Sequence, residues 1–368
     1  MKKVTYILSH IDKAIAFEWI IDNIDSSKFQ LSFILLNENG SAIEDYIRSK
    51  NIAVYRIPFS SKKDYPSAFL STRKTIKLIN PDIVHCHMRD ANIIGLLAAK
   101  FSRIKKRIYT RHFSTYNHIY FPKAVKVDKL INRWSTDIVA ISQVVKDTLT
   151  MKEGVQESKI SLINHGFDLD KFANKNIPDI QRLKEEYNPD NRQPVVGVIA
   201  RYIDWKGHKY IINAFQKLLE KYPDALFIFA NCRGPEKVEI SELIKKHIPK
   251  NSIEIDFEQD LFSLYHLLDI YVHTPINPDI EAFGQTYVEA LAAGIPSVFS
   301  ISGIAGEFIE NNKNAIVVKH KNSEEIISAI LYFLNNEKDR DRIILEGQKS
   351  VQRFGLEPFI NKLESLYE

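Results

Sequence analysis

Two glutamates flank small and polar residues in the segment DIEAFGQTYVEALAAGIPSV, residues 279–298. Glu281 precedes a predicted helix and Glu289 lies on it; if all eight steps were helical, they would lie about 12 Å apart along the axis. That separation is comparable to a diphosphate with a sugar at each end. Free N–H groups and the dipole of a helix start favour phosphate. We therefore expect one carboxylate per sugar ring and phosphates over the helix start. The alternative is a surface helix with ordinary glutamates. The candidate N–H donors belong to Phe283, Gly284, Gln285 and Thr286.

A second group of residues that could bind phosphate follows the predicted strand at residues 195–200. The loop RYIDWKGH places Arg201 and Lys206 at the carboxyl end of that strand, where phosphates bind in doubly wound folds. A guanidinium can hold a phosphate through two hydrogen bonds, and an ammonium adds a point charge. Two cations and a helix start could balance a diphosphate without a metal ion. The alternative is a solvated turn, in which both residue types are common.

Strand and helix patterns alternate along nearly the whole chain, which favours parallel sheets covered on both faces. We predict an α/β protein with two doubly wound, Rossmann-like domains that face a cleft. The domains are expected at residues 1–170 and 194–345, with a polar linker at 171–193 and a helical tail at 346–368. Predicted strands cover residues 4–8, 31–36, 53–57, 82–87, 107–110, 137–141 and 159–163, then 195–200, 225–230, 253–255, 270–273, 297–300 and 315–318.

The composition of the 368 residues limits the class of protein. A net charge of +4 is too small to indicate a nucleic-acid partner. Cys86 and Cys232 cannot form a disulfide framework, so a reducing compartment is expected. The first apolar run is too short for a signal peptide, and no run approaches the 18 apolar residues of a membrane span. We therefore expect a cytoplasmic protein.

Two short motifs could suggest a metal ion, but we interpret both as structural. His85 and His87 share one face of a predicted strand, yet no third ligand with zinc spacing is visible. Asp168 and Asp170 form a D-x-D pattern, and an Asp before a helix usually caps it. Neither G-x-G-x-x-G nor a P-loop motif occurs, which argues against dinucleotide and P-loop sites.

Residues 100–134 are basic and aromatic, with Asp128 as the only acid. A solvated basic face with aromatic residues in the core is one interpretation. The other is a patch that attracts an anionic membrane surface and brings a lipid-linked acceptor to the first domain. In that case the protein would be peripheral on the inner face of the plasma membrane.

The phosphate-binding segments together resemble the retaining glycosyltransferases of family 4, which have the GT-B fold. The strongest marks are the E-x7-E segment from Glu281 to Glu289 and the loop from Arg201 to Lys206. Supporting marks are DIVHCH at 82–87, YTRH at 109–112, IVAIS at 138–142, INHGFDLDKF at 163–172, LLDIYVHTP at 267–275 and FGLEPFINKLESLYE at 354–368.

The resemblance implies transfer of a sugar from a nucleotide diphosphate-sugar to a glycan or lipid-linked acceptor, with retention and without a metal ion or other cofactor. Arg201 and Lys206 would hold the diphosphate, Glu281 the transferred sugar and Glu289 the ribose. His112 matches a histidine that reaches toward the donor sugar. The tail at 346–368 would pack back on the first domain.

The sequence departs from the family pattern in two loops. The first loop is usually glycine-rich, whereas Ser9 to Ala14 contains no glycine. His10 or Asp12 could face the acceptor there instead. The strand at 225–230 usually ends in a Gly-Asp-Gly-like turn and here continues as NCRG. The alternatives are a nucleotide-sugar 2-epimerase, which should lack AFGQTYVEALAAGIPSV in this form, and a non-catalytic nucleotide-sugar-binding subunit, which should have lost one of the four charged residues.

Overall fold

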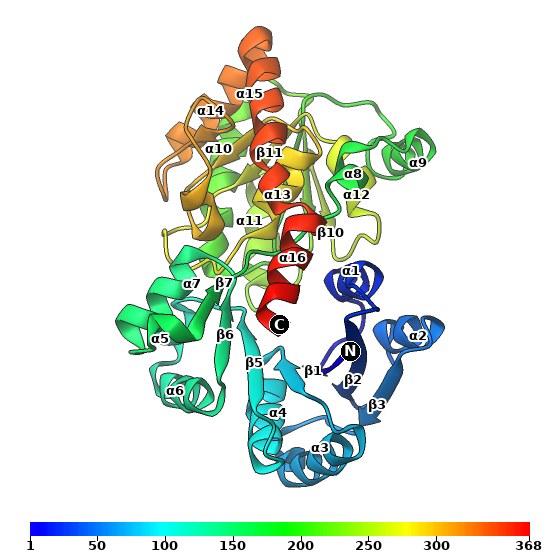
Figure 1. Ribbon diagram of the computed structural model, residues 1–368. Coiled ribbons are helices and arrows are strands. Elements are labelled where there is room, and N and C mark those ends of the chain that lie inside the picture. Colours follow the sequence, from blue (N-terminus) through cyan, green and yellow to red (C-terminus); the bar gives the residue numbers. More distant parts are fainter. The chain divides into compact units, whose positions relative to one another are not determined.

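The computed structural model describes all residues from 1 to 368. The chain forms two compact units, of which the first comprises Met1–Phe167 and Leu356–Glu368 and the second Asp168–Gly355. Each unit contains one sheet of parallel strands with helices around it (Figure 1). The α/β prediction of two Rossmann-like domains is therefore confirmed. None of the helices combines the length and the apolar composition that a membrane span needs.

The sheet of the first unit has seven strands in the order β3-β2-β1-β4-β5-β6-β7. Because the chain leaves β1 in one direction along the sheet and resumes at β4 on its other side, the order reverses between these two strands. In such folds ligands bind at this switch point, beyond the carboxyl ends of the strands. The strands are β1 Lys2–Ser9, β2 Phe29–Leu36, β3 Ala53–Ile57, β4 Ile83–Cys86, β5 Lys106–Arg111, β6 Asp137–Ala140 and β7 Ile160–Leu162.

Helices cover both faces of this sheet. Alternate residues of β1 face opposite sides: Tyr6 joins a core with α1, α2 and α16, whereas Ile7 lies under α4. Gly95 of α4 allows that close packing, because a Cβ there would lie 2.7 Å from Cys86 Sγ. The helices are α1 Ile15–Asn23, α2 Ala42–Ser49, α3 Tyr65–Ile79, α4 Arg89–Phe101, α5 Tyr116–Tyr120, α6 Val125–Trp134, α7 Gln143–Asp147 and α16 Leu356–Tyr367.

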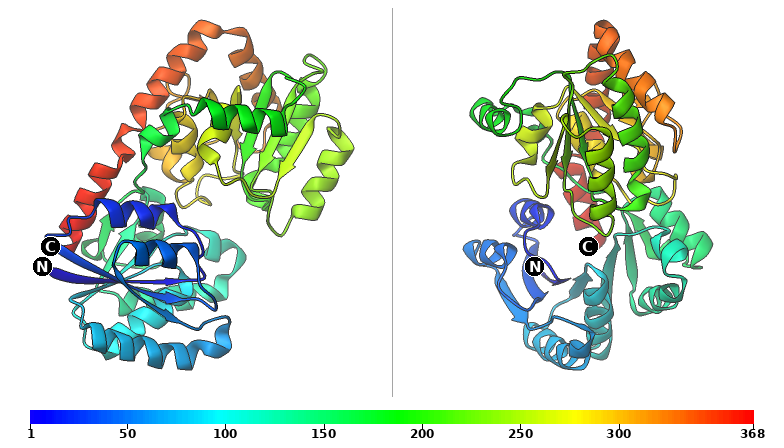
Figure 2. Two further views of the ribbon diagram at one scale, coloured as in Figure 1. Left: turned by 90° about the vertical axis from the view of Figure 1, so that its right-hand side faces the viewer. Right: turned by 180° about the vertical axis from the view of Figure 1, so that it is seen from behind.

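The C-terminal helix α16 is part of the core of the first unit. The Tyr367 hydroxyl contacts the Tyr6 hydroxyl and lies 2.7 Å from His85 Nδ1, and all three side chains are buried. Lys2 Nζ donates to the Tyr367 carbonyl at 3.1 Å, so the two ends of the chain lie side by side (Figure 2). The last helix therefore closes the apolar face that β1 and α1 would otherwise expose.

A buried polar network fixes the segment that follows β5. The Arg111 guanidinium, 1% exposed, lies 2.5 Å from Glu153 Oε1 and 3.7 Å from Asp128 Oδ2. Asn132 donates to the second Glu153 oxygen at 2.7 Å, and Asn117 donates to Asp128 at 2.8 Å. Charges taken out of water must be paired and hydrogen-bonded, so this network ties α5 and α6 to the end of β5.

The second unit repeats the topology with six parallel strands in the order β10-β9-β8-β11-β12-β13. Its switch point lies between β8 and β11. The strands are β8 Val195–Ile199, β9 Leu226–Ala230, β10 Ser252–Ile255, β11 Ile270–His273, β12 Ser297–Phe299 and β13 Ile316–Val317. The helices are α8 Leu169–Ala173, α9 Ile177–Tyr187, α10 His208–Leu218, α11 Lys237–His247, α12 Leu261–His266, α13 Gln285–Ala292, α14 Ser323–Asn335 and α15 Glu337–Ser350.

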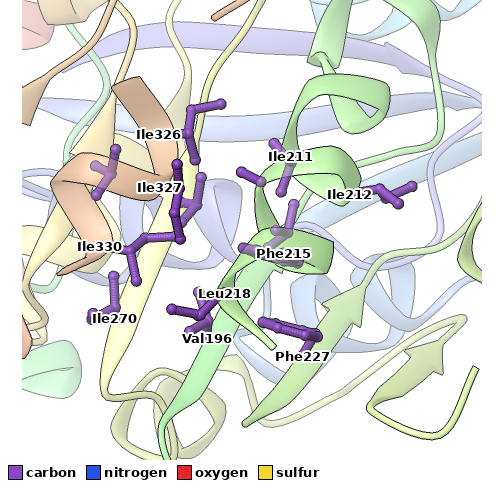
Figure 3. Close-up of a cluster of buried hydrophobic side chains, with 14 of the residues drawn as sticks. Val196, Ile211, Ile212, Phe215, Leu218, Phe227, Ile270, Ile326, Ile327 and Ile330 are labelled. Carbon is purple, nitrogen blue, oxygen red and sulfur yellow. The ribbon is translucent and has the colours of Figure 1, made fainter. Parts of the chain in front are cut away.

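The core of the second unit lies between its sheet and helices α10 and α14 (Figure 3). Ile211 and Phe215 project from successive turns of α10 toward Ile326 and Ile330 of α14. The rings of Phe215 and Phe227 stack at 4.2 Å between their centroids. These contacts anchor α10, whose N-terminus follows the loop with the two predicted phosphate-binding cations.

Two regions are more helical than the sequence indicated. The predicted linker at 171–193 contains α9, and the compact second unit already begins at Asp168. Asp168 caps α8 by accepting from the Lys171 N–H at 3.3 Å, as expected for this D-x-D. The basic stretch contains α5 and α6, which were not predicted. The buried residues of α6 are Asp128, Ile131 and Asn132, and the two polar ones belong to the Arg111 network.

We expect Arg111→Met to destabilise the first unit by about 3–5 kcal/mol, since it leaves two buried carboxylates without their cation. Urea unfolding followed by the fluorescence of Trp19 and Trp134 measures this, in a Trp205→Phe background that removes the tryptophan of the second unit.

Arg103→Met is the matched control, because Arg103 is exposed and makes no ion pair. A loss of stability for Arg111→Met no larger than for this control would show that the buried network does not hold the segment in place.

Candidate active site

The helix start that the sequence indicated is α13, and it begins at Gln285. The eight steps from Glu281 to Glu289 are therefore not all helical, and the 12 Å estimate does not apply. Gly284 caps the helix in the left-handed region, with φ of 83°. The preceding loop is bound to the turn after β12, where Ile304 N–H donates to the Phe283 carbonyl at 2.9 Å. The loop thus turns Glu281 back toward the end of β11.

Lys206, Glu281 and His273 form a compact charged cluster at the switch point of the second unit. Lys206 Nζ contacts Glu281 Oε1, and His273 Nε2 lies 3.1 Å from the same oxygen. The side chains of Lys206 and Glu281 are only 13% and 7% exposed. The cluster joins three segments, the loop after β8, the end of β11 and the loop before α13.

The environment keeps Glu281 ionised. Burial alone would raise the pKa of this carboxyl, but the charge of Lys206 and the hydrogen bond from His273 outweigh it and lower the pKa to about 2. Burial also lowers the pKa of His273, and the neighbouring Lys206 adds to that effect. At neutral pH the cluster is therefore an ammonium, a carboxylate and a neutral imidazole.

Two glycines allow these segments to meet. A Cβ on Gly207, whose φ is 80°, would lie 2.2 Å from the Thr274 carbonyl oxygen. A Cβ on Gly303, whose φ is 56°, would lie 2.7 Å from the Phe283 carbonyl oxygen. Both positions need glycine for backbone conformation and for space. The Trp205 carbonyl further ties the cationic loop to the β11 side by accepting from Ile276 N–H at 2.9 Å.

Arg201 lies on the same loop as Lys206 but is held differently. Its side chain is exposed and makes no ion pair or hydrogen bond within the protein. The predicted pair of cations thus consists of one buried, engaged ammonium and one guanidinium that is available to a ligand.

Glu289 is half-buried on α13 and has a different environment from Glu281. One of its oxygens accepts from the Tyr265 hydroxyl at 2.8 Å. Burial raises the pKa of Glu289 to about 7, against the opposing effects of the Tyr265 hydrogen bond and the Lys206 charge. The field of Lys206 therefore reaches both glutamates.

The start of α13 presents free donors. The N–H groups of Gly284, Gln285 and Thr286 have no acceptor within the protein, as expected for a helix N-terminus. The side chain of Phe283 is buried against Phe354, with 5.9 Å between ring centroids, so only its backbone could contact a ligand.

Two buried polar atoms beside the cluster have no hydrogen-bond partner in the protein, namely His273 Nδ1 and Thr274 Oγ1. Such atoms are normally satisfied by water or a ligand. Together with the free helix donors, they indicate a site for a polar ligand with several hydrogen-bonding groups.

The predicted site residues of the first unit lie at the carboxyl ends of its strands. His112 follows β5; its Nε2 lies 3.0 Å from His87 Nδ1, and its ring stacks on His165 at 5.7 Å. Burial lowers the pKa of His112 to about 4, so the ring is neutral at pH 7. His85, by contrast, uses both ring nitrogens on Tyr367 and Thr110, and no group of His, Cys, Asp and Glu side chains is arranged to hold a metal ion.

His10 and Asp12 follow β1. His10 Nε2 lies 3.2 Å from Asp90 Oδ2, and Asp12 Oδ1 accepts from the Ala42 N–H at the start of α2 at 3.1 Å. Asp12 therefore has a structural role as well as an exposed position. His10 has φ of 50°, so it occupies the left-handed conformation that a glycine would adopt in a glycine-rich loop.

Sequence reasoning did not assign roles to His273, Tyr265 and Ser302, which hold the two glutamates. Ser302 Oγ accepts from the Glu281 N–H at 3.3 Å. His273 could have been found, because it is the last residue of a predicted strand and so lies at the ligand-binding edge of the sheet. Tyr265 gives no such signal, since only the folded chain brings α12 beside α13.

Two family models together match most of the chain. The model described as "Glycosyltransferase Family 4" matches residues 25–171, and "Glycosyl transferases group 1" matches residues 179–350. The first therefore falls in the first unit, apart from the last four residues, and the second lies within the second unit.

The chain is also similar to individual proteins over most of its length. It is 25% identical to the alpha-monoglucosyldiacylglycerol synthase of Acholeplasma laidlawii, over 84% of this chain and 81% of that protein. It is 23% identical to the capsular polysaccharide biosynthesis glycosyltransferase CapM of Staphylococcus aureus, over 88% and 91%. The structure of Anabaena HepE in complex with UDP-glucose matches all of both chains, with a TM-score of 0.85 at 20% identity. The chain belongs to the GT-B glycosyltransferases of the family 4 type.

Proposed function

We propose that this glycosyltransferase is a retaining, metal-independent hexosyltransferase that uses a nucleotide diphosphate-sugar. The observation that supports this most is the buried Lys206–Glu281 pair beside the free donors of α13, with the unpaired Arg201 on the same loop. This arrangement supplies positive charge and N–H groups for a diphosphate and a carboxylate for sugar hydroxyls. It balances the leaving phosphate without a metal ion.

Each residue has a role that follows from its environment. Arg201 and Lys206 bind the diphosphate and stabilise the charge that develops as the glycosidic bond breaks. Glu281 is a carboxylate at neutral pH and accepts hydrogen bonds from the transferred sugar. Glu289 accepts from the ribose hydroxyls when it is ionised. His112 is neutral and can exchange hydrogen bonds with the donor sugar.

The acceptor is proposed to be a glycan or lipid-linked sugar of cell-surface polysaccharide or glycolipid assembly. The similarity to an alpha-monoglucosyldiacylglycerol synthase and to a capsular polysaccharide biosynthesis glycosyltransferase supports this class. Release of nucleotide from a panel of UDP-, GDP- and ADP-sugars, with and without chelator, tests the proposal. Activity that vanishes with chelator would contradict the metal-independent scheme, and conversion of the sugar without transfer or hydrolysis would indicate an epimerase.

In that assay we expect Lys206→Ala to lower turnover by about 10²–10³-fold, the usual loss when one group that stabilises transition-state charge is removed. Lys209→Ala is the matched control, because Lys209 lies three residues further on, is exposed and pairs with Glu239 at 2.7 Å.

The single variant leaves Glu281 buried without its cation, so folding is checked with the Lys206→Ala/Glu281→Gln double variant. The double variant should unfold near the wild-type temperature and remain inactive. Turnover close to wild type in either variant would contradict the assigned roles.

Donor use should depend on pH through Glu289. Since burial raises the pKa of Glu289 to about 7, it is mostly protonated below that pH and cannot accept from both ribose hydroxyls. We therefore expect kcat/KM for the donor to rise as pH increases through about 7. Glu289→Gln should flatten this rise, whereas a rise that persists unchanged in the variant would assign the titration to another group.

We further propose that α5, α6 and the turn between them contact an anionic membrane surface. The only acid of this region, Asp128, is buried with Arg111, so it does not offset the surface charge. Phe121 is 53% exposed, and Ile119 and Leu130 of the same region are also exposed. The exposed cations, none of which forms an ion pair, are Lys123, Lys126, Lys129 and Arg133.

Co-sedimentation with phosphatidylglycerol vesicles at low salt should show binding that phosphatidylcholine vesicles do not. Replacing both Lys126 and Lys129 with glutamine should weaken binding to the phosphatidylglycerol vesicles by about 2 kcal/mol, roughly 30-fold, because each cation contributes about 1 kcal/mol. The control replaces Lys245 and Lys246, two exposed lysines of α11 in the second unit. Equal binding to both vesicle types would contradict the membrane proposal.

A further inference from the structure

The two histidines of the DIVHCH motif, His85 and His87, have different partners. Both rings lie against Tyr6, because alternate residues of a strand face the same side of the sheet, whereas Cys86 between them lies under α4. His85 uses both ring nitrogens within the core. His87 lies one residue beyond β4, a strand that borders the switch point, and its Nδ1 is 3.0 Å from His112 Nε2. The second histidine of the motif therefore contacts a predicted site residue.

Packing holds the two rings of this contact in place. The backbone N–H of His87 donates to the Ile7 carbonyl at 3.0 Å, and its ring meets that of Phe17 edge to face, with 4.9 Å between centroids. The ring of His112 stacks on that of His165, with 10° between their planes. His87 is 6% exposed, whereas His112 is half-buried. Turning either ring would disrupt this packing, so the two nitrogens face each other in a fixed geometry.

Both rings are neutral at pH 7. Burial, followed by the neighbouring His85, His112 and His165, holds the pKa of His87 well below its ordinary value. Burial lowers the pKa of His112 to about 4. A neutral imidazole carries one proton, so one of its nitrogens donates and the other accepts. The hydrogen bond between the rings therefore has two possible arrangements, which differ in the nitrogen that carries the proton on each ring.

The surroundings of His87 Nε2 distinguish the two arrangements, because this atom is buried and has no hydrogen-bond partner in the protein. If His112 donated, His87 would carry its proton on Nε2, and a buried N–H would lack an acceptor. Buried donors without an acceptor are rarer than buried acceptors without a donor. If His87 donates from Nδ1, its Nε2 is unprotonated, and His112 accepts at Nε2. His112 then carries its proton on Nδ1, which has no hydrogen-bond partner in the protein.

We propose that His87 is a positioning residue for His112, which it holds in place with the proton on Nδ1, so that His112 meets the donor sugar as a hydrogen-bond donor. The inference rests on the proposed function, in which His112 contacts that sugar. It goes further by giving the direction of the hydrogen bond. The ring donates to a sugar oxygen and does not accept from a sugar hydroxyl.

NMR on the full chain with ¹⁵N-labelled histidine observes the position of this proton directly. Two-bond ¹H–¹⁵N spectra at pH 7 distinguish a protonated from an unprotonated ring nitrogen, and the signals that disappear in His112→Gln identify His112. We expect Nδ1 of His112 to be protonated in the wild-type protein. In His87→Leu, which lacks the donor, we expect Nε2 to become protonated in part of the molecules.

A wild-type spectrum with the proton on His112 Nε2 would overturn the proposal, and so would an unchanged tautomer in His87→Leu. The wild-type spectrum alone decides the tautomer if the leucine variant does not fold. The matched control is His85→Asn, because His85 is a buried, hydrogen-bonded histidine of the same motif whose ring nitrogens bond to other residues. It should leave the His112 tautomer as it is in the wild type.

Kinetics separates positioning from a purely structural role. In His87→Asn the side-chain amide can still donate to His112 Nε2, so this variant should keep most of the activity. We expect His87→Leu to lower kcat/KM for the nucleotide sugar by about 3- to 10-fold, as for the loss of one hydrogen bond. A loss in His87→Asn as large as in His87→Leu would contradict the positioning role.

The spectra need no substrate, so they decide the proton position whether or not a nucleotide sugar is turned over. Absence of nucleotide release from every nucleotide sugar would contradict the proposed function and leave the tautomer assignment standing. Wild-type release together with a proton on His112 Nε2 would contradict the inference alone.

Discussion

The candidate site of the second unit is organised around one interaction, the buried ion pair between Lys206 and Glu281. Taking two charges out of water costs several kcal/mol per ion, and a buried pair is rarely the most stabilising choice for a fold. The chain nevertheless provides two left-handed glycines, Gly207 and Gly303, so that the segments bearing this pair can meet. A protein selected for stability alone would place apolar side chains here, so we interpret the pair as stored charge for a ligand.

Because the two sheets have the same topology, both units place charged or polar side chains beyond the two strands at which the strand order reverses. In the second unit Lys206 follows β8 and Glu281 follows β11, the two strands at which the strand order reverses. In the first unit His10 follows β1 and Asp90 lies beyond β4, again on either side of the reversal. A switch point leaves a gap between diverging connections, and side chains from two strands can reach into it.

Much of the fold could be predicted from the sequence, because strands, helices and helix ends depend on residues that are close together in the chain. Alternating strands and helices define the two sheets, and Gly294, with φ of 71°, follows the C-cap of α13 in the left-handed conformation that is usual for glycine just past a helix end. What could not be predicted depends on contacts between distant segments. The helices within 116–134 are hard to recognise because two of the three buried residues of α6, Asp128 and Asn132, are polar and belong to the Arg111 network. The pairing of Glu281 with His273 likewise requires the loop before α13 to turn back, which no periodicity reveals.

The two glutamates that opened the sequence analysis show why residue spacing alone is an incomplete guide to chemistry. Both are carboxylates on one segment, yet Lys206 and His273 lower the pKa of Glu281 to about 2, while burial raises that of Glu289 to about 7. Glu281 therefore stabilises the fold above its ordinary pKa of 4.5 and loses that contribution as pH falls toward 2. Burial favours the neutral acid form of Glu289. In the free protein its carboxylate form therefore has too few hydrogen-bond donors. A ligand with two adjacent hydroxyls would supply the missing donors, and this need distinguishes Glu289 from an ordinary surface glutamate.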